Sequence, residues 1–203
     1  MLTDQRATPR FRPQRGRYGA LAVALLVATG GLAEAASGEA QRGGGGRQRQ
    51  AGRMNAAQHN ARGVELIGES KLEEALEAFE NAIELDPELS QAHFNKGLVH
   101  WNLAQLDDAI VAYGTAVQLD PGYAEAYFRL GQAFYGKRRV QECIEALQRA
   151  VEVDPLHAAA HLSLGNVFFT EGRVEESVAA LEKAVQADPE VAAHVRSSGG
   201  APA

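Results

Sequence analysis

The hydrophobic positions between residues 56 and 191 follow the spacing of amphipathic helices, in units that recur every 34 residues. In the first unit, apolar residues at intervals of three and four predict helices over residues 57–69 and 72–85. Three further units repeat the pattern without an insertion, and each closes on an Asp-Pro pair. Because proline lacks an amide hydrogen and disfavours helix in the residue before it, this pair predicts where the second helix ends.

Several positions keep the same kind of residue in all four units. A glycine recurs in the first helix, and a small residue, a large residue and an alanine recur in the second. The glycines are Gly63, Gly97, Gly131 and Gly165, the small residues are Ala75, Ala109, Cys143 and Ser177, and the large ones are Phe79, Tyr113, Leu147 and Leu181. Glycine and the small residue mark the point where the two helices of a unit cross, and the large residue fills the space under the first helix.

This pattern resembles the tetratricopeptide repeat family. The resemblance covers residues 56–191 and implies an all-α fold, a right-handed α-solenoid of four antiparallel helix-turn-helix hairpins. The hairpins are residues 56–89, 90–123, 124–157 and 158–191. One hairpin cannot bury its apolar face alone, so neighbours stack and leave a concave side. Members of this family are non-catalytic scaffolds that bind other proteins.

In the family, first-helix residues at repeat positions two, five, six, nine, twelve and thirteen line the concave groove. Positions five, nine and twelve share one helical face. Carried onto this chain, the predicted partner-binding groove is Phe94, Asn95, Leu98, Trp101, Phe128, Arg129, Gln132, Tyr135, Leu162, Asn166 and Phe169. Its aromatic members are typical interface anchors, so we expect an apolar helix or extended peptide to bind there. The alternative is that part of this set packs inside the stack.

One subset of the family holds a partner's C-terminal carboxylate with lysine, asparagine and arginine. Asn95 and Arg129 match two of those positions, but the others hold Asn60, Val64 and Glu125. The set is incomplete, so we do not expect a carboxylate clamp. Arg129 alone remains available to pair with one acidic group of a partner.

No side chains have the spacing of a catalytic or metal site. Cys143 and Ser177 occupy the small crossing position, so packing explains them better than reactivity. His157 and His161 are four residues apart, but no third metal ligand is evident near them. We therefore expect no enzymatic activity, no metal and no cofactor.

The first 35 residues have the order of a secretory signal peptide. Arginines between residues 6 and 17 precede an uncharged apolar run over 19–33, and Ala33-Glu34-Ala35 then suits signal peptidase. The run is shorter than the roughly 20 residues that span a bilayer as a helix. We expect cleavage near Ala35 and export to the periplasm. An uncleaved anchor in the inner membrane facing the periplasm, and an organelle transit peptide, are the alternatives.

Two other segments flank the repeats. Residues 36–55 are rich in glycine, glutamine and arginine, which predicts a flexible linker; a basic arm that contacts anionic lipid is the alternative. Residues 192–203 predict a disordered tail, too short and glycine-rich for a capping helix. The outer face of the last helix, including Val178 and Val185, is therefore expected to stay exposed, for self-association or for a partner.

The repeats are acidic. Residues 54–191 contain 10 basic and 23 acidic residues, a net charge of −13. Nucleic acid is thus an unsuitable partner, because phosphate backbones bind to cations. We expect a protein or peptide partner and a role as an adaptor of the cell envelope. The alternatives are a chaperone-like holder of many apolar segments and a self-assembling scaffold.

Overall fold

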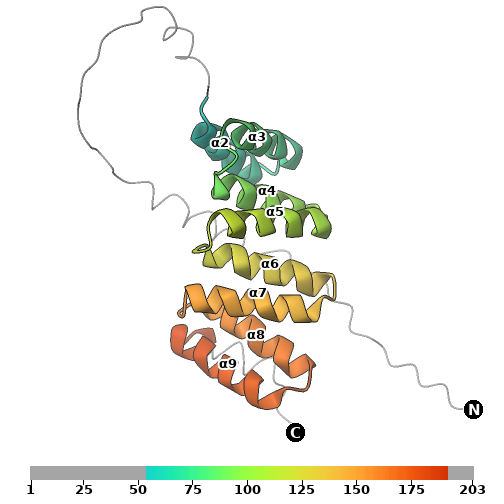
Figure 1. Ribbon diagram of the computed structural model, residues 1–203, viewed down its shortest axis with the longest axis vertical. Helices are drawn as coiled ribbons and strands as arrows, with labels where there is room; N and C mark the ends of the chain where they lie inside the picture. Colours follow the sequence, from blue (N-terminus) through green and yellow to red (C-terminus); the bar gives the residue numbers. More distant parts are fainter. Residues whose placement is uncertain (1–53, 192–203) are drawn as a thin grey trace, which may run out of the picture. The chain divides into compact units, whose positions relative to one another are not determined.

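The computed structural model describes residues 54–191, which form four helical hairpins (Figure 1). The first helices, which we call the A helices, are Ala56–Gly68 (α2), Ser90–Asn102 (α4), Ala124–Gly136 (α6) and Ala158–Thr170 (α8). The second, or B helices, are Leu72–Leu85 (α3), Leu106–Leu119 (α5), Val140–Val153 (α7) and Val174–Ala187 (α9). The all-α repeat fold is confirmed.

The predicted signal peptide, most of the predicted linker and the predicted tail lie outside the described residues. Among residues 54–191, no helix has the length and apolar character needed to cross a membrane.

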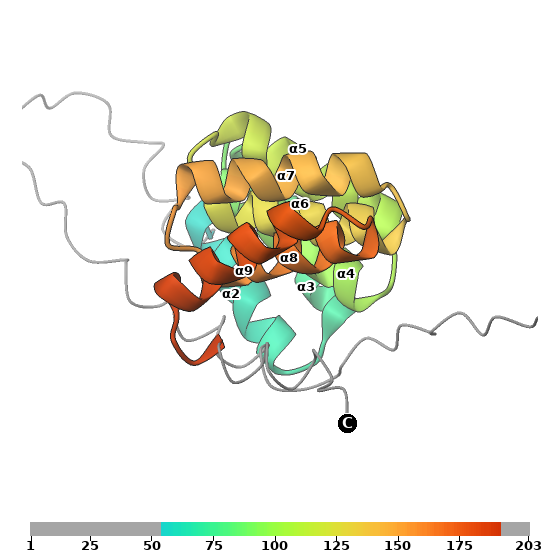
Figure 2. The same ribbon diagram turned by 90° about the horizontal axis from the view of Figure 1, so that it is seen from below.

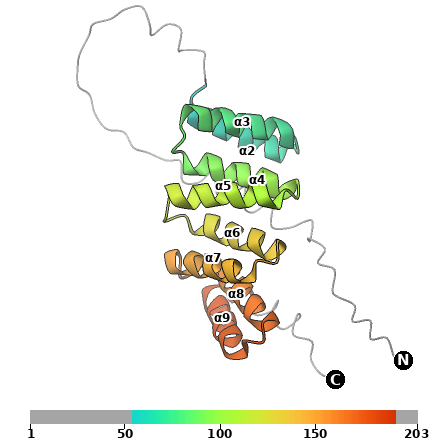
Figure 3. The ribbon, with the colours of Figure 1, turned by 45° about the vertical axis from the view of Figure 1, so that its right-hand side comes forward.

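The hairpins stack in chain order (Figures 1 and 3). Each A helix packs against its own B helix, and each B helix then packs against the next A helix. Figure 2 looks along the stack from the end formed by α8 and α9. Each interior hairpin is therefore covered by neighbours on both sides, while α2 and α9 lie at the two ends.

The turn inside each hairpin ends the A helix with a left-handed residue. Ser70, Ala104 and Arg138 have φ angles of 61°, 59° and 60°, and Gly172 has 75°. In the first turn, the Lys71 amide donates to the Leu66 carbonyl at 2.9 Å, which caps the helix end. Only the fourth turn has the glycine that adopts this conformation without a steric cost.

The Asp-Pro pairs end the B helices as predicted. Asp86, Asp120, Asp154 and Asp188 are the C-cap residues, and each has an extended backbone. Each carboxylate also accepts a hydrogen bond from the amide two residues later, at 2.9–3.2 Å. This turn, which the side chain of aspartate favours, fixes the direction in which the chain enters the next A helix.

The glycine of each A helix lies directly against the large residue of its B helix. A Cβ atom at Gly97 would lie 2.6 Å from the Tyr113 ring, and one at Gly165 would lie 2.6 Å from Leu181 Cγ. Tyr113 is fully buried, and its hydroxyl has no hydrogen-bond partner within the described residues. The glycine is therefore a requirement of close helix packing.

Candidate protein-binding face of the A helices

Repeat position twelve holds the two exposed aromatic residues of the A helices and a third that is partly buried. Trp101 of α4 is partly buried, Tyr135 of α6 is 38% exposed and Phe169 of α8 is 70% exposed. We call these three residues, one from each of three consecutive hairpins, the aromatic ladder. We call the A-helix residues at positions two, five, six, nine, twelve and thirteen the A-face.

The other two aromatic residues predicted for the groove are not accessible. Phe94 is 2% exposed and Phe128 is 6% exposed, so the expectation that they line an open surface is wrong. The Phe94 ring packs 4.8 Å from the Tyr123 ring, and the Phe128 ring packs 5.0 Å from the His157 ring, centroid to centroid. Tyr123 and His157 both precede an A helix. Position five is thus covered by the loop that enters the next hairpin.

The remaining predicted groove residues differ in exposure. Leu98 and Leu162 are partly buried, and Asn166 is exposed. Asn95 is 1% exposed, and its Nδ2 donates to Asn60 Oδ1 at 2.9 Å. This amide pair joins α4 to α2, so Asn95 already has a partner within the chain. Sequence reasoning did not predict this pair.

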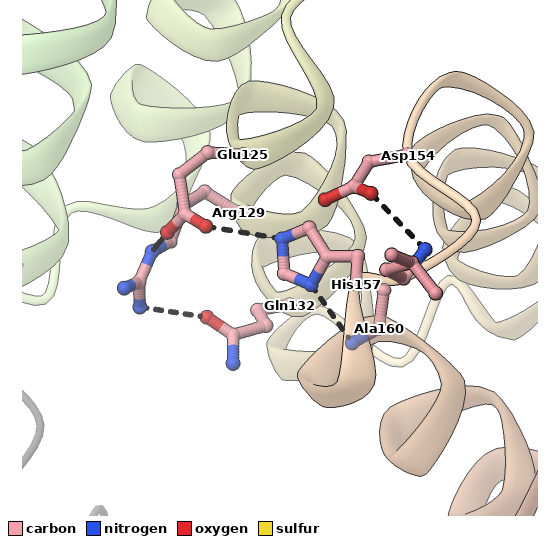
Figure 4. A network of polar contacts seen from close by, with 7 residues as sticks. Glu125, Arg129, Gln132, Asp154, His157 and Ala160 are labelled. Carbon is pink, nitrogen blue, oxygen red and sulfur yellow. Dashed lines mark hydrogen bonds and ion pairs between the residues drawn. The ribbon is translucent and has the colours of Figure 1, made fainter. Parts of the chain in front are cut away.

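Arg129 and Gln132 belong to a polar network that joins α6 to the start of α8 (Figure 4). Arg129 Nε donates to Glu125 Oε1 at 2.7 Å, and Arg129 Nη1 donates to Gln132 Oε1 at 3.1 Å. Glu125 Oε2 lies 3.1 Å from His157 Nε2. Burial alone would raise the pKa of Glu125, but the hydrogen bond with His157 and the charge of Arg129 lower it. The carboxylate is therefore ionised at neutral pH.

The residues considered as reactive or metal-binding, Cys143, Ser177 and His161, are buried. Cys143 is 1% exposed, and burial raises the pKa of its thiol to about 11. Ser177 Oγ donates to the Gly165 carbonyl at 2.8 Å, across the helix crossing. His161 Nε2 lies 3.0 Å from the Pro155 carbonyl oxygen. In residues 54–191, no group of three or more histidine, cysteine, aspartate or glutamate residues is placed to hold a metal ion.

Sequence models of the tetratricopeptide repeat match most of this stack. A model described as "Tetratricopeptide repeat" matches residues 128–192, and one described as "TPR repeat" matches residues 66–103 and 105–137. Together the matches cover more than half of the chain. The chain belongs to the tetratricopeptide repeat family. No curated protein sequence matches it.

Solved tetratricopeptide repeat structures share the fold. A MamA protein is 27% identical, with a TM-score of 0.62 over 66% of this chain and 73% of the other. MamA from Desulfovibrio magneticus RS-1 is 24% identical, with a TM-score of 0.60 over 66% and 76% of the two chains. The first repeat domain of Spaghetti (RPAP3), bound to the HSP90 peptide SRMEEVD, is 21% identical, with a TM-score of 0.56 over 58% and 93%.

Proposed function

We propose that this chain is a non-catalytic scaffold that binds a segment of a partner protein along its A-face. The observation that carries the proposal is the aromatic ladder. Exposed aromatic side chains are frequent anchors of protein interfaces, because they bury a large apolar area at a small entropic cost. Family membership and the peptide-bound repeat domain of Spaghetti (RPAP3) support this kind of partner.

The charge of the repeats points to an apolar, largely uncharged segment. The peptide SRMEEVD of the Spaghetti (RPAP3) structure is acidic at its C-terminal end. On this chain the net charge of residues 54–191 is −13, and Arg129 is already paired with Glu125. An acidic peptide would therefore meet general repulsion and no unpaired arginine at this site.

We place this function in the cell envelope. The support is the order of residues 1–35, in which an arginine-rich segment, an apolar run and Ala33-Glu34-Ala35 follow one another as in an export signal. These residues lie outside the part of the chain that the structure describes.

The ladder is tested by removing its two most exposed rings. We expect a tagged Tyr135→Ala/Phe169→Ala variant to fold normally and to lose partners that the unmodified protein captures from the envelope fraction. Val111→Ala is the matched control, since Val111 is 68% exposed but lies on the B helix α5. With a purified partner, Trp101 emission then reports binding, and the double variant should bind about ten-fold or more weakly, the loss of at least one interface anchor.

The number of captured proteins separates the two versions of this function. One or two stoichiometric partners support an adaptor, whereas a broad set of unrelated proteins supports a chaperone-like holder. If the double variant retains every partner, the A-face is not the binding surface.

The two ends of the stack differ, and this favours self-association as a second role. At the positions where α6 and α8 bury small or apolar residues against the preceding B helix, α2 has exposed Gln58, Arg62 and Glu65. Arg62 Nη1 pairs with Glu65 at 2.9 Å. An apolar surface placed over this end would remove water from Arg62 and Glu65 and offer no hydrogen-bond partners in its place. The α2 end therefore resists stacking.

The α9 end is apolar instead. Val174 is 53% exposed and Val178 is 50% exposed, while Ile144, the equivalent of Val178 one repeat earlier, is 4% exposed. Val185, also predicted to be exposed, is partly buried. Of the ways in which the two ends can meet, only α9 on α9 brings apolar surface against apolar surface. Such a contact is isologous and closes at a dimer, whereas α9 on α2 would build a filament.

Sedimentation velocity over a concentration series tests this contact. We expect a reversible dimer and no larger species for the unmodified protein, and a monomer for Val178→Glu. Val111→Glu, which places the same charge on another exposed B-helix valine, should leave the dimer intact. A strict monomer at every concentration, or assembly beyond the dimer, would contradict the proposal.

A further inference from the structure

Glu125 and Arg129 are the charged residues of the A-face. At positions two, five, six, nine, twelve and thirteen, the four A helices otherwise carry alanine, glycine, apolar, aromatic, amide or hydroxyl residues. The two charges lie one helical turn apart on α6 and form an ion pair of 2.7 Å. The A-face therefore has no net charge, although residues 54–191 carry −13.

The ion pair is held from both sides (Figure 4). His157 Nδ1 accepts the Ala160 amide hydrogen at 3.3 Å, so the proton of the neutral ring lies on Nε2 and points to Glu125 Oε2 at 3.1 Å. Both carboxylate oxygens thus have a donor. The Arg129 guanidinium is fixed by Glu125 and Gln132, and it lies 5.3 Å from the centre of the Phe128 ring.

We propose that Glu125 determines the specificity of the A-face by binding, from within the chain, the guanidinium that a partner's carboxylate would otherwise bind. An incoming carboxylate must share the Arg129 guanidinium with Glu125 and remain within a few ångströms of its negative charge, which is repulsive. An uncharged apolar segment meets neither obstacle, so the pair selects such segments by rejecting acidic ones. This inference rests on the proposed binding function.

The surroundings of the pair match this role. The Arg129 side chain is 22% exposed, so it is partly accessible to a partner on the A-face. The Glu125 side chain is 37% exposed, so replacing it does not leave a deep cavity. The pKa of Glu125 is lowered by the hydrogen bond with His157 and by Arg129, against the effect of burial, and its negative charge is therefore present at neutral pH.

The test uses the full repeat protein and the acidic heptapeptide SRMEEVD as the probe, with SRMQQVN-amide as its carboxylate-free counterpart. Each peptide carries a fluorophore at its N-terminus, and affinity is measured by anisotropy at low ionic strength and pH 7.5. Glu125→Gln removes the charge and keeps the size of the side chain. We expect it to bind SRMEEVD at least about ten-fold more tightly than the unmodified protein does, since one charge–charge contact is worth roughly that factor. The affinity of the carboxylate-free peptide should change by less than about three-fold, because it has no carboxylate to compete with Glu125 for Arg129.

The gain must depend on Arg129. We expect Glu125→Gln/Arg129→Met to lose the increase, and urea denaturation to show that the variants are folded. If Glu125→Gln is unstable, Glu125→Ala is used in its place. Equal affinity of the unmodified and Glu125→Gln proteins for SRMEEVD, including no detectable binding by either, would overturn the inference.

The peptide-binding test of this inference and the partner-capture test of the proposed function can fail independently. A gain through Arg129 combined with normal partner capture by the Tyr135→Ala/Phe169→Ala variant would retain the role of Glu125 and reject the aromatic ladder as the binding site. Loss of partner capture without a gain in affinity for SRMEEVD would retain the aromatic ladder as the binding site and reject the role of Glu125.

Discussion

Replacing Phe94 with alanine is expected to lower the free energy of unfolding by about 3–5 kcal/mol, the usual cost of removing a buried aromatic ring. The ring is 2% exposed, and it packs against Tyr113 at 5.7 Å and Tyr123 at 4.8 Å between ring centres. These neighbours come from the same hairpin and from the loop that enters the next one. Removing the Phe94 ring would therefore weaken both the packing within one repeat and the interface with the next repeat.

The measurement is urea denaturation followed by far-UV circular dichroism, with Trp101 fluorescence as a second probe. Trp101 packs on the same core cluster as Phe94, so its signal reports the affected region. Because a solenoid is stabilised by each repeat and by each contact between neighbours, both probes should show the loss.

Phe169→Ala is the matched control. It removes the same ring from another A helix, so the change in helix propensity is the same in kind, but Phe169 is 70% exposed. We expect its effect to stay within about 0.5 kcal/mol. A Phe94→Ala variant as stable as Phe169→Ala would show that position five does not belong to the core, and Phe94 would return to the binding surface.

The contrast between Phe94 and Phe169 shows which features can be predicted from the sequence and which cannot. The 34-residue register, the helices and their ends follow from features that recur within each unit: apolar spacing, glycine and the Asp-Pro pair. Those features act over short distances along the chain. The predicted helices over residues 57–69 and 72–85 accordingly differ from the observed first hairpin by no more than one residue at an end.

The exposure of an A-helix residue depends on residues far along the chain. Phe128 is covered by His157, which lies 29 residues later, where the chain enters α8. Position alone does not reveal this, because position twelve on the same helical face stays open at Tyr135. The repeat did contain a signal: Tyr123 and His157 are one 34-residue step apart, as are the two phenylalanines they cover.

The polar contacts of the A-face also could not be predicted from the sequence. Glu125 departs from the carboxylate clamp, which the sequence shows, but its pairing with Arg129 and His157 required the spatial arrangement of α6 and the start of α8. The same holds for the Asn60–Asn95 pair, whose members are 35 residues apart. In both cases the contact depends on how one hairpin packs against the next, which no local pattern in the sequence shows.

Gly97→Ala is expected to destabilise the protein by about 1–3 kcal/mol, although alanine is the better helix former. The new Cβ atom would lie 2.6 Å from two atoms of the Tyr113 ring, which is fully buried. Either the ring leaves its rotamer or α4 moves away from α5, and both weaken the core. Thermal and urea denaturation of the variant measure the loss.

Gly114→Ala is the control of opposite sign. Gly114 lies inside the B helix α5, and a Cβ atom there would have no atom within 4 Å. Without a clash, only the gain in helix propensity remains, so we expect about 0.5–1 kcal/mol of stabilisation. Two identical substitutions in adjacent helices should therefore shift stability in opposite directions.

A double-mutant cycle identifies the cause of the loss at Gly97. Tyr113→Ala removes the whole ring, and it should be destabilising alone because it leaves a cavity. Combined with Gly97→Ala, the absence of the ring makes room for the new methyl group. The double variant should then lose less stability than the sum of the two single variants, by about 0.5–3 kcal/mol of coupling. Additive losses would mean that Tyr113 is not what excludes a side chain at Gly97.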